Sequence, residues 1–197
     1  MPARLTALLA SRGGHFEMES RYHADRWFDL DRLFAARAPL QPFAETLAHR
    51  LAAHGVEAVC GPMTGGAQLA AMIGAALGLD AFAAERFAPA DAPGLFPVKY
   101  FVASPQREKL RGRRVAIVDD AISAGSALRA THADLLACGA QPVALGALFV
   151  FGDAAAPFAA AQNLPLEAIV RLPFHLWPPA ECPLCRAGIA LEKVSAA

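Results

Sequence analysis

The chain has 197 residues, a length typical of one domain or of one domain with a small appendage. Apolar residues make up 55% of the chain and charged residues 18%, so the composition excludes a disordered chain and supplies a sizeable core. Eighteen basic residues balance eighteen acidic ones, and the resulting zero net charge argues against a broad nucleic-acid-binding surface.

Nothing in the sequence predicts export or membrane insertion. The apolar stretch after Arg4 is too short for the hydrophobic region of a signal peptide. The longest uncharged run, residues 58–79, has the length of a membrane helix, but two glycine-containing turns interrupt it near its start. A strand, a glycine loop and a helix fit this run better. Four cysteines without an export signal favour a reducing compartment. We therefore expect a cytoplasmic protein that has no membrane partner.

The first forty residues are predicted to form a small unit ahead of the main core. Residues 2–12 show the leucine spacing of a short amphipathic helix, which a glycine pair would end. Aromatic residues alternate with charged ones over residues 15–34, a pattern that favours paired short strands. A helix is then expected over residues 42–54.

From residue 56 onward, predicted strands alternate with predicted helices. The strands cover residues 56–60, 81–87, 98–103, 114–118 and 143–151, the helices 68–77 and 126–138, and 88–97 and 105–112 are predicted as a loop and a turn. The alternation predicts an α/β fold in which helices flank a parallel sheet. Residues 164–175 are expected to add an edge strand, and the tail from Trp177 is irregular.

The most informative segment runs from Arg113 to Leu128. An apolar strand leads into Asp119 and Asp120, and a loop of small residues then opens a helix. Ligands bind beyond the carboxyl ends of parallel strands, and a helix N-terminus offers free N–H groups to an anion. Two adjacent carboxylates would repel each other there unless they met hydroxyl groups or a cation. A ribose 5-phosphate with Mg²⁺ meets all of these requirements.

This segment resembles the phosphoribosyl pyrophosphate (PRPP) signature of the type I phosphoribosyltransferases. That signature has four apolar residues, two acids, two apolar residues and then small residues around a glycine. The resemblance implies that the two acids orient the ribose hydroxyls and hold Mg²⁺, directly or through water. The implied PRPP ligands here are Asp119, Asp120, Ala121, Ile122, Ser123, Ala124, Gly125 and Ser126. The alternative interpretation is an acidic turn in an ordinary α/β protein.

A second glycine-rich loop lies about 55 residues upstream of the acid pair. It resembles the family's pyrophosphate loop, in which backbone N–H groups hold the leaving group and bulky side chains would block that approach. The implied PRPP-binding residues are Pro62, Met63, Thr64, Gly65 and Gly66. Arg86, near the end of the next strand, matches an arginine that contacts pyrophosphate in relatives, although it also fits an ordinary surface residue.

The N-terminal segment resembles the orotate phosphoribosyltransferases, which carry Phe-x-Leu-x-Ser ahead of an aromatic-rich strand. Here Phe16-Glu-Met-Glu-Ser precedes Trp27-Phe28, and the resemblance covers roughly residues 5–150. It implies a base site formed by Phe16, Glu19 and Phe151.

The cations that would meet an anionic base are not kept. Glu19 stands where those enzymes have a lysine, and Phe149 to Asp153 lacks their arginine. Each lost charge-assisted bond removes about 1.5–3 kcal/mol of recognition. Glu19 would instead accept N–H groups from an amino- or amide-bearing base, so the identity of the base stays open.

The segment 88–112 is expected to close over the site as a lid and exclude water. It contains no histidine and is poorer in lysine than the lids of orotate enzymes. Lys99 and Arg107 are the predicted catalytic cations, with Tyr100 beside them. In related dimers a basic lid group reaches the neighbouring site, so the resemblance also implies a homodimer.

The tail contains a CxxC formed by Cys182 and Cys185. One CxxC supplies two of the four ligands of a structural zinc site, and His175 is the nearest candidate for a third. The spacing of His15 and His23 does not indicate a ligand role. Free thiols, a metal site completed by His175 or another subunit, and a redox pair remain open.

Together these observations predict one phosphoribosyltransferase domain. Residues 1–40 form a hood, residues 55–155 the PRPP-binding core and residues 172–197 a cysteine-containing tail. The expected activity is Mg²⁺-dependent transfer of 5-phosphoribosyl from PRPP to a nitrogen base, in nucleotide metabolism and by resemblance in pyrimidine biosynthesis. Two alternatives are a non-catalytic PRPP or nucleotide sensor that regulates a partner, and a metal-linked assembly module.

Overall fold

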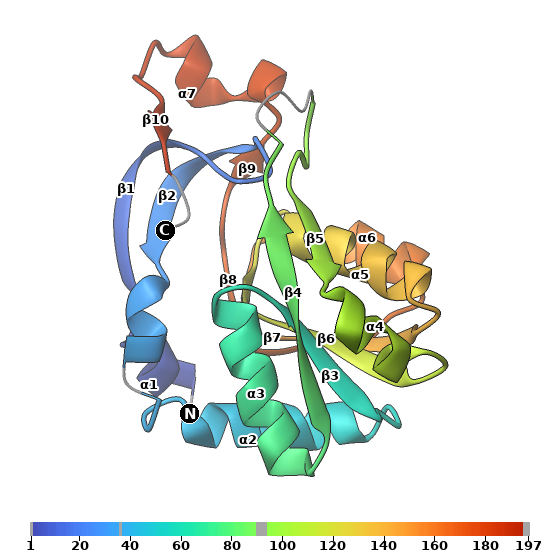
Figure 1. Cartoon of the computed structure of the whole chain (residues 1–197). Helices are drawn as coiled ribbons and strands as arrows, with labels where there is room; N and C mark the ends of the chain where they lie inside the picture. Colours follow the sequence, from blue (N-terminus) through green and yellow to red (C-terminus); the bar gives the residue numbers. More distant parts are fainter. Residues whose placement is uncertain (1, 36, 90–93, 195–197) are drawn as a thin grey trace.

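The architecture comes from a computed structural model, which describes residues 2–35, 37–89 and 94–194. Six strands form the main sheet in the order β5-β4-β3-β6-β7-β8 (Figure 1). They are β3 (Ala58–Pro62), β4 (Asp80–Phe87), β5 (Lys99–Val102), β6 (Arg114–Ile122), β7 (Gln141–Phe151) and β8 (Leu166–Leu172). Only the β4–β5 pair is antiparallel, which confirms the predicted α/β fold and the edge strand near the C-terminus.

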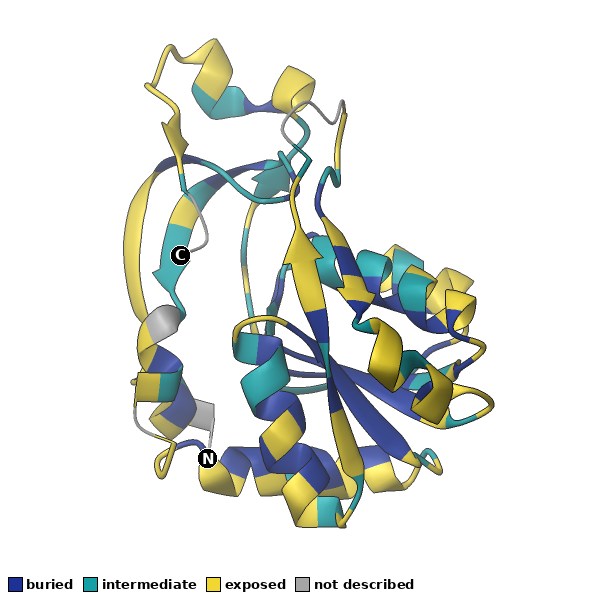
Figure 2. Ribbon diagram, in the orientation of Figure 1, coloured by how far each residue is buried: buried dark blue, intermediate teal, exposed yellow. Residues whose placement is uncertain are grey.

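Helices cover both faces of this sheet (Figure 1). On one face lie α2 (Gln41–Ala52) and α3 (Gly65–Leu77), and on the other α4 (Ser104–Leu110), α5 (Ser126–Ala137) and α6 (Ala156–Ala161). Side chains alternate along each strand, so Val115 and Ile117 pack under α5 while Ala116 and Val118 pack under α3. Burial on both faces explains the continuous apolar strands of the central sheet (Figure 2).

The segment after β5 differs from its prediction as a turn. Residues 105–112 were expected to form no regular structure, but α4 begins at Ser104, with Pro105 in its first turn. Proline fits the start of a helix because the first N–H groups of a helix have no partner within it, so the N–H that proline lacks is not needed there. Leu110 is fully buried, so α4 is anchored to the core.

The hood and the tail together form a second, four-stranded sheet in the order β10-β1-β2-β9. Its strands are β1 (Ala10–Glu17), β2 (His23–Asp29), β9 (Leu176–Trp177) and β10 (Glu192–Lys193), and a 3₁₀ segment (Asp31–Ala35) leads out of it. The paired strands predicted over residues 15–34 are confirmed. The tail supplies both edges of the sheet, so the two ends of the chain are interleaved (Figure 1).

The predicted N-terminal helix over residues 2–12 is wrong beyond its first turns. Helix α1 covers only Pro2–Thr6, and β1 runs through the glycine pair that was expected to stop the helix. The strand register shifts between Gly13 and Phe16, and a Cβ on Gly14 would lie 2.5 Å from the Phe16 ring. The glycines therefore serve a bulge in a strand rather than a helix end.

The tail between β9 and β10 consists of a 3₁₀ turn (Pro179–Glu181) and a short helix, α7 (Pro183–Arg186).

In the part of the chain that the structure describes, no helix combines the length and the apolarity that crossing a bilayer would need.

Candidate active site

A cavity of about 670 Å³ opens between the hood and the carboxyl ends of β3 and β6. This is the edge at which open α/β sheets bind ligands. The core contributes Pro62, Met63, Thr64, Gly65, Glu85, Arg86, Tyr100, Asp119, Asp120, Ala121, Ile122, Ser123, Gly125, Ser126, Ala127 and Leu128 to its wall. The hood and tail contribute Met18, Glu19, Ser20, Trp27, Phe28, Leu30 and Val194.

The acid pair stands where β6 ends. Asp119 is 8% exposed and accepts the Asp120 backbone N–H at Oδ1 (3.0 Å), while Asp120 Oδ1 accepts the N–H of Ala121 (2.8 Å). Burial, followed by the negative charge of Asp120, raises the pKa of Asp119 well above its usual value. A cation or a hydroxyl-rich ligand would relieve that cost, as expected for a Mg²⁺-bound ribose.

Helix α5 begins directly beyond the acid pair. Gly125 precedes it with φ of 78°, a left-handed conformation that glycine adopts without strain. No side chain caps this helix end, so its first N–H groups remain available to an anion. Ser123, Gly125 and Ser126 line the cavity at this point, whereas Ala124 is buried behind them.

The β3–α3 loop packs directly against the acid pair. A Cβ on Gly65 would lie 2.1 Å from Asp120 Oδ2, and one on Gly66 would lie 2.7 Å from Asp119 Oδ1. The peptide bond between Met63 and Thr64 is cis. Gly65 faces the cavity, whereas Gly66 is buried beneath it. The two loops that sequence alone placed 55 residues apart therefore form one continuous wall, and the glycines are needed for that contact.

Glu19 connects the hood to this wall. Its carboxylate accepts hydrogen bonds from Arg86 Nε (3.0 Å), the Tyr100 hydroxyl (3.2 Å) and the Ser126 hydroxyl (3.0 Å). Burial and the nearby Glu19 raise the pKa of Tyr100, so its hydroxyl stays protonated as a donor. Arg86 does line the cavity, but its guanidinium is paired with Glu19.

The aromatic wall differs from its prediction. Phe16 was expected at the base site, but it is 1% exposed inside the hood and Arg12 stacks on its ring. Phe151 is also buried and stacks beneath Phe28, with ring centroids 4.2 Å apart. Phe28 therefore presents the surface that was expected from Phe151. The sequence did place Phe28 in a predicted aromatic strand, but that pattern does not indicate which side of the strand faces the cavity.

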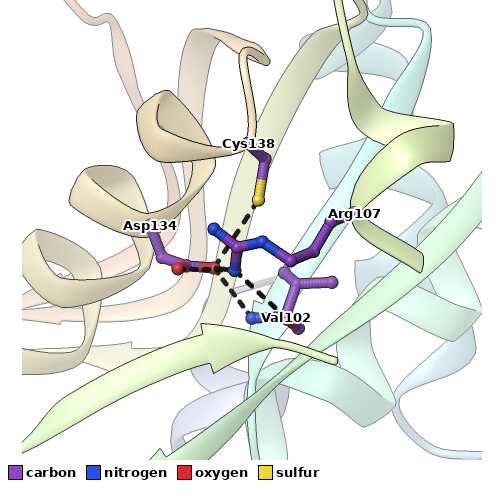
Figure 3. Close-up of polar contacts among 4 residues, drawn as sticks. All are labelled: Val102, Arg107, Asp134 and Cys138. Atoms are coloured by element: carbon purple, nitrogen blue, oxygen red, sulfur yellow. Dashed lines mark hydrogen bonds and ion pairs between the residues drawn. The ribbon is translucent and has the colours of Figure 1, made fainter. Parts of the chain in front are cut away.

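The two predicted catalytic cations do not lie at the cavity. Arg107 donates to both carboxylate oxygens of Asp134 on α5, at 2.8 and 2.9 Å (Figure 3). The Val102 N–H donates to the same carboxylate at 2.8 Å, so Arg107 ties α4 and β5 to α5. Lys99 is exposed on β5 and does not line the cavity, whereas its neighbour Tyr100 does.

These contacts also correct the predicted lid. Residues 99–102 form β5 and residues 104–110 form α4, so this part of the predicted lid is regular structure rather than a loop. Residues 94–98 precede β5, and there the Phe96 N–H donates to the Ser20 carbonyl of the hood at 3.1 Å. Residues 90–93 of the predicted lid lie outside the described residues. Among the described residues of the predicted lid, 88–89 and 94–98 lie outside regular structure before β5 and remain candidates for a lid.

Comparison with known proteins decides the family. No family model matches the chain. An orotate phosphoribosyltransferase of Heliobacterium modesticaldum is 30% identical over 182 residues, which cover 89% of this chain and 85% of the relative. The chain belongs to the orotate phosphoribosyltransferase family. The Thermotoga maritima enzyme is 29% identical over 181 residues, covering 91% of this chain and 89% of the relative.

Solved structures confirm the type I phosphoribosyltransferase fold. Adenine phosphoribosyltransferase from Thermoanaerobacter pseudethanolicus aligns with a TM-score of 0.67 at 12% identity, covering 87% of this chain and all of that one. Orotate phosphoribosyltransferase from Aeropyrum pernix aligns with a TM-score of 0.62 at 22% identity, covering 83% and 88%. The curated relatives thus make the chain a phosphoribosyltransferase of the orotate-like group. The two PRPP motifs predicted the transferase, and the N-terminal segment predicted the orotate-like group.

The tail cysteines lie away from the cavity. Cys182 and Cys185 meet two histidines of the hood, His15 and His23, which the sequence did not connect with them. His175, the histidine expected beside them, is paired with Asp25 at 2.8 Å instead. No sequence spacing indicates this cluster, because its two halves lie about 160 residues apart.

Proposed function

We propose that this enzyme transfers the 5-phosphoribosyl group of PRPP to a planar nitrogen base and releases pyrophosphate. The observation that carries the proposal is the direct contact between the acid pair and the Gly65-Gly66 loop at one wall of the cavity. The N-terminus of α5 would hold the 5-phosphate, and the loop before α3 the pyrophosphate. Asp119 and Asp120 would orient the ribose hydroxyls between them.

Mg²⁺ fits the residues present. Carboxylate oxygens are the ligands it prefers, and the buried Asp119 lies beside a second acid. Asp119 and Asp120 would hold it, directly or through water, and when bound it neutralises charge on the pyrophosphate leaving group.

The transfer is a substitution at the anomeric carbon of the ribose. A base nitrogen forms a bond to that carbon while the bond to pyrophosphate breaks. Pyrophosphate leaves with the electron pair, and the proton carried by the attacking nitrogen is released to water. Positive charge grows on the sugar and negative charge on the leaving group, so stabilisation is mainly electrostatic and positional. The loop N–H groups would meet the developing negative charge, and the acid pair would lie beside the positive sugar. The hood already lines the cavity and would limit the access of water to the reacting atoms.

Glu19 would select the base. Its carboxylate lies between Arg86, Tyr100 and Ser126 at the cavity, where an N–H of a base can reach it. Among the described residues that line the cavity, Arg86 is the one cation, and Glu19 already neutralises it. We therefore expect a base that offers N–H donors rather than a second carboxylate, held beneath Phe28 of the hood.

Orotate is the second candidate, favoured by the names of the relatives. The carboxylate of orotate would have to displace Glu19 from its ion pair with Arg86. We also propose a homodimer, a cytoplasmic location and a role in pyrimidine biosynthesis, as the sequence resemblance and the cysteine usage led us to expect. Light scattering of the purified protein measures the oligomeric state directly.

The test is pyrophosphate release from PRPP and Mg²⁺, with orotate in one reaction and amino- or amide-bearing bases in the others. We expect release with a base that carries N–H donors and little with orotate. Release with orotate alone would contradict the role given to Glu19. Tight PRPP binding without release in any reaction would contradict transfer and support the sensor.

A further inference from the structure

The strongest unexplained feature is a cluster of two histidines and two cysteines where the hood meets the tail. His15 lies on β1, His23 opens β2, Cys182 precedes α7 and Cys185 lies within it. One ligand atom from each lies within 4.8 Å of all the others. None of the four lines the cavity, so the site chemistry does not account for them.

The separations match a tetrahedral metal site. With Zn–N near 2.05 Å and Zn–S near 2.3 Å, the edges of a tetrahedron are about 3.3 Å for N–N and about 3.6 Å for N–S. His15 Nε2 lies 3.1 Å from His23 Nδ1 and 3.4 Å from Cys182 Sγ. Cys185 Sγ lies 3.2 Å from His23 Nδ1 and 3.7 Å from His15 Nε2. Four of the six edges are therefore close to those of a zinc tetrahedron, and the other two are no longer than 4.8 Å.

The orientation of His15 is fixed for ligation. Its Nδ1 lies 2.8 Å from the Ile189 carbonyl, which can only accept a hydrogen bond. Nδ1 therefore carries the proton, and the lone pair of Nε2 points into the cluster. This is the usual arrangement of a metal-binding histidine, whose second nitrogen donates to an oxygen outside the first shell.

Burial and charge favour an occupied site. His15, His23 and Cys182 are each less than 5% exposed. Among residues 171–194, Cys182 is the one buried residue, and all others are half-buried or exposed. The tail thus has almost no apolar anchor of its own. Cys185 is the one exposed ligand. Two thiolates and a divalent cation sum to zero charge, so a Zn(Cys)₂(His)₂ unit buried on its other three ligands carries no uncompensated charge.

We propose that His15, His23, Cys182 and Cys185 bind one structural zinc ion that fastens the C-terminal tail to the hood. The N₂S₂ tetrahedral set selects zinc, and four protein ligands leave no open position for a catalytic water. The zinc would hold β10 against β1 and thereby fix the turn between β1 and β2 that carries Glu19. That last consequence rests on the proposed function, whereas zinc binding itself does not.

Metal analysis of untagged, full-length protein tests the site. We expect one zinc ion per chain in the wild type, and at least a tenfold loss in the Cys182→Ser/Cys185→Ser variant. Cys138→Ser and His175→Ala remove a thiol and an imidazole outside the cluster and are expected to retain zinc. A wild-type protein without zinc after purification under reducing conditions and incubation with Zn²⁺ would overturn the proposal, as would a double variant that retains it.

A second measurement covers failure of the double variant to fold. Wild-type protein is stripped with a chelator and refilled with Co²⁺, and the expected result is the visible spectrum of tetrahedral Co²⁺ with thiolate charge-transfer bands. Octahedral Co²⁺, or a Cys182–Cys185 disulfide in the reduced preparation, would contradict the assignment. Stripping is also expected to speed amide exchange at least tenfold in β1, β2 and α7 and to leave β3 and β6 unchanged. If zinc binds but the KM of the base does not change on stripping, the positioning of Glu19 fails while the zinc site stands.

Discussion

The main sheet and the hood are built by different means. All five residues of β3 are buried, and the central strands pack apolar side chains on both faces. In the hood, the first five residues of β1 are exposed, and three of its buried residues are polar: His15, Ser20 and His23. A rigid apolar sheet thus positions the loops proposed to bind PRPP, whereas polar contacts across distant segments position the wall proposed to select the base.

The largest expected effect lies on the core side of this comparison. Asp119→Asn with Asp120→Asn removes the charges that would hold the ribose hydroxyls and Mg²⁺. Two lost charge-assisted interactions correspond to about a 100- to 10,000-fold fall in kcat/KM. Turnover of the best base measures it. The variant should remain folded, because a buried carboxylate with a raised pKa costs stability at neutral pH.

Gly65→Ala should separate loop packing from charge. The added methyl group would meet Asp120 Oδ2 at 2.1 Å, so the loop and the acid pair must move apart. We expect a loss of PRPP affinity of about tenfold or more, measured by calorimetry. Gly13→Ala in β1 is the matched control, since its Cβ would meet its nearest atom at 3.9 Å. Equal affinities in the two variants would contradict the close packing of the loops.

Glu19→Gln tests the hood side. It keeps the shape of the side chain but removes the charge that Arg86, Tyr100 and Ser126 share. The KM of the base should rise roughly 10- to 100-fold, while the KM of PRPP changes little. Glu17→Gln, two residues earlier and away from the cavity, is the control. A rise confined to the KM of PRPP would contradict the role of Glu19 in base selection and assign it to PRPP binding.

Arg107→Ala is expected to affect stability and leave the chemistry intact. The change leaves Asp134 without the guanidinium that bridges α4 and α5 (Figure 3). Loss of a hydrogen bond to a charged group costs about 1.5–3 kcal/mol of unfolding free energy. Urea denaturation measures it, with exposed Lys99→Ala as the control. A large fall in kcat at unchanged stability would restore Arg107 as a catalytic residue.

The smallest effect concerns pH. Burial lowers the pKa of His132, so the folded protein takes up a proton there less readily than the unfolded chain. The stability contributed by neutral His132 is present above about pH 6.5 and is lost as the pH falls toward the lower folded value. His132→Gln should therefore flatten the loss of unfolding free energy between about pH 6.5 and 5, measured by urea titration. An unchanged slope would contradict the role of His132.

The sequence predicted the parts that depend on local patterns. Apolar runs and glycine turns located β3, β6, β7 and both loops of the core, because strands that are buried on both faces read as continuous apolar runs. Phe16 and Phe28 lie on neighbouring strands of the hood, and the sequence pattern does not indicate that Phe28 faces the cavity while Phe16 is buried. Arg107 resembled a lid cation until α4 brought it to Asp134. The His15–Cys182 contact spans 167 residues, and no local pattern encodes it.

Calorimetric titration of Mg²⁺-PRPP into three proteins, in the absence of any base, tests the division between the two walls most directly. The wild type and Glu19→Gln should bind PRPP with similar affinity, and the Asp119→Asn/Asp120→Asn variant should bind it at least 100-fold more weakly. Wild-type affinity in the aspartate variant would contradict the central claim that the β6–α5 loop is the PRPP site.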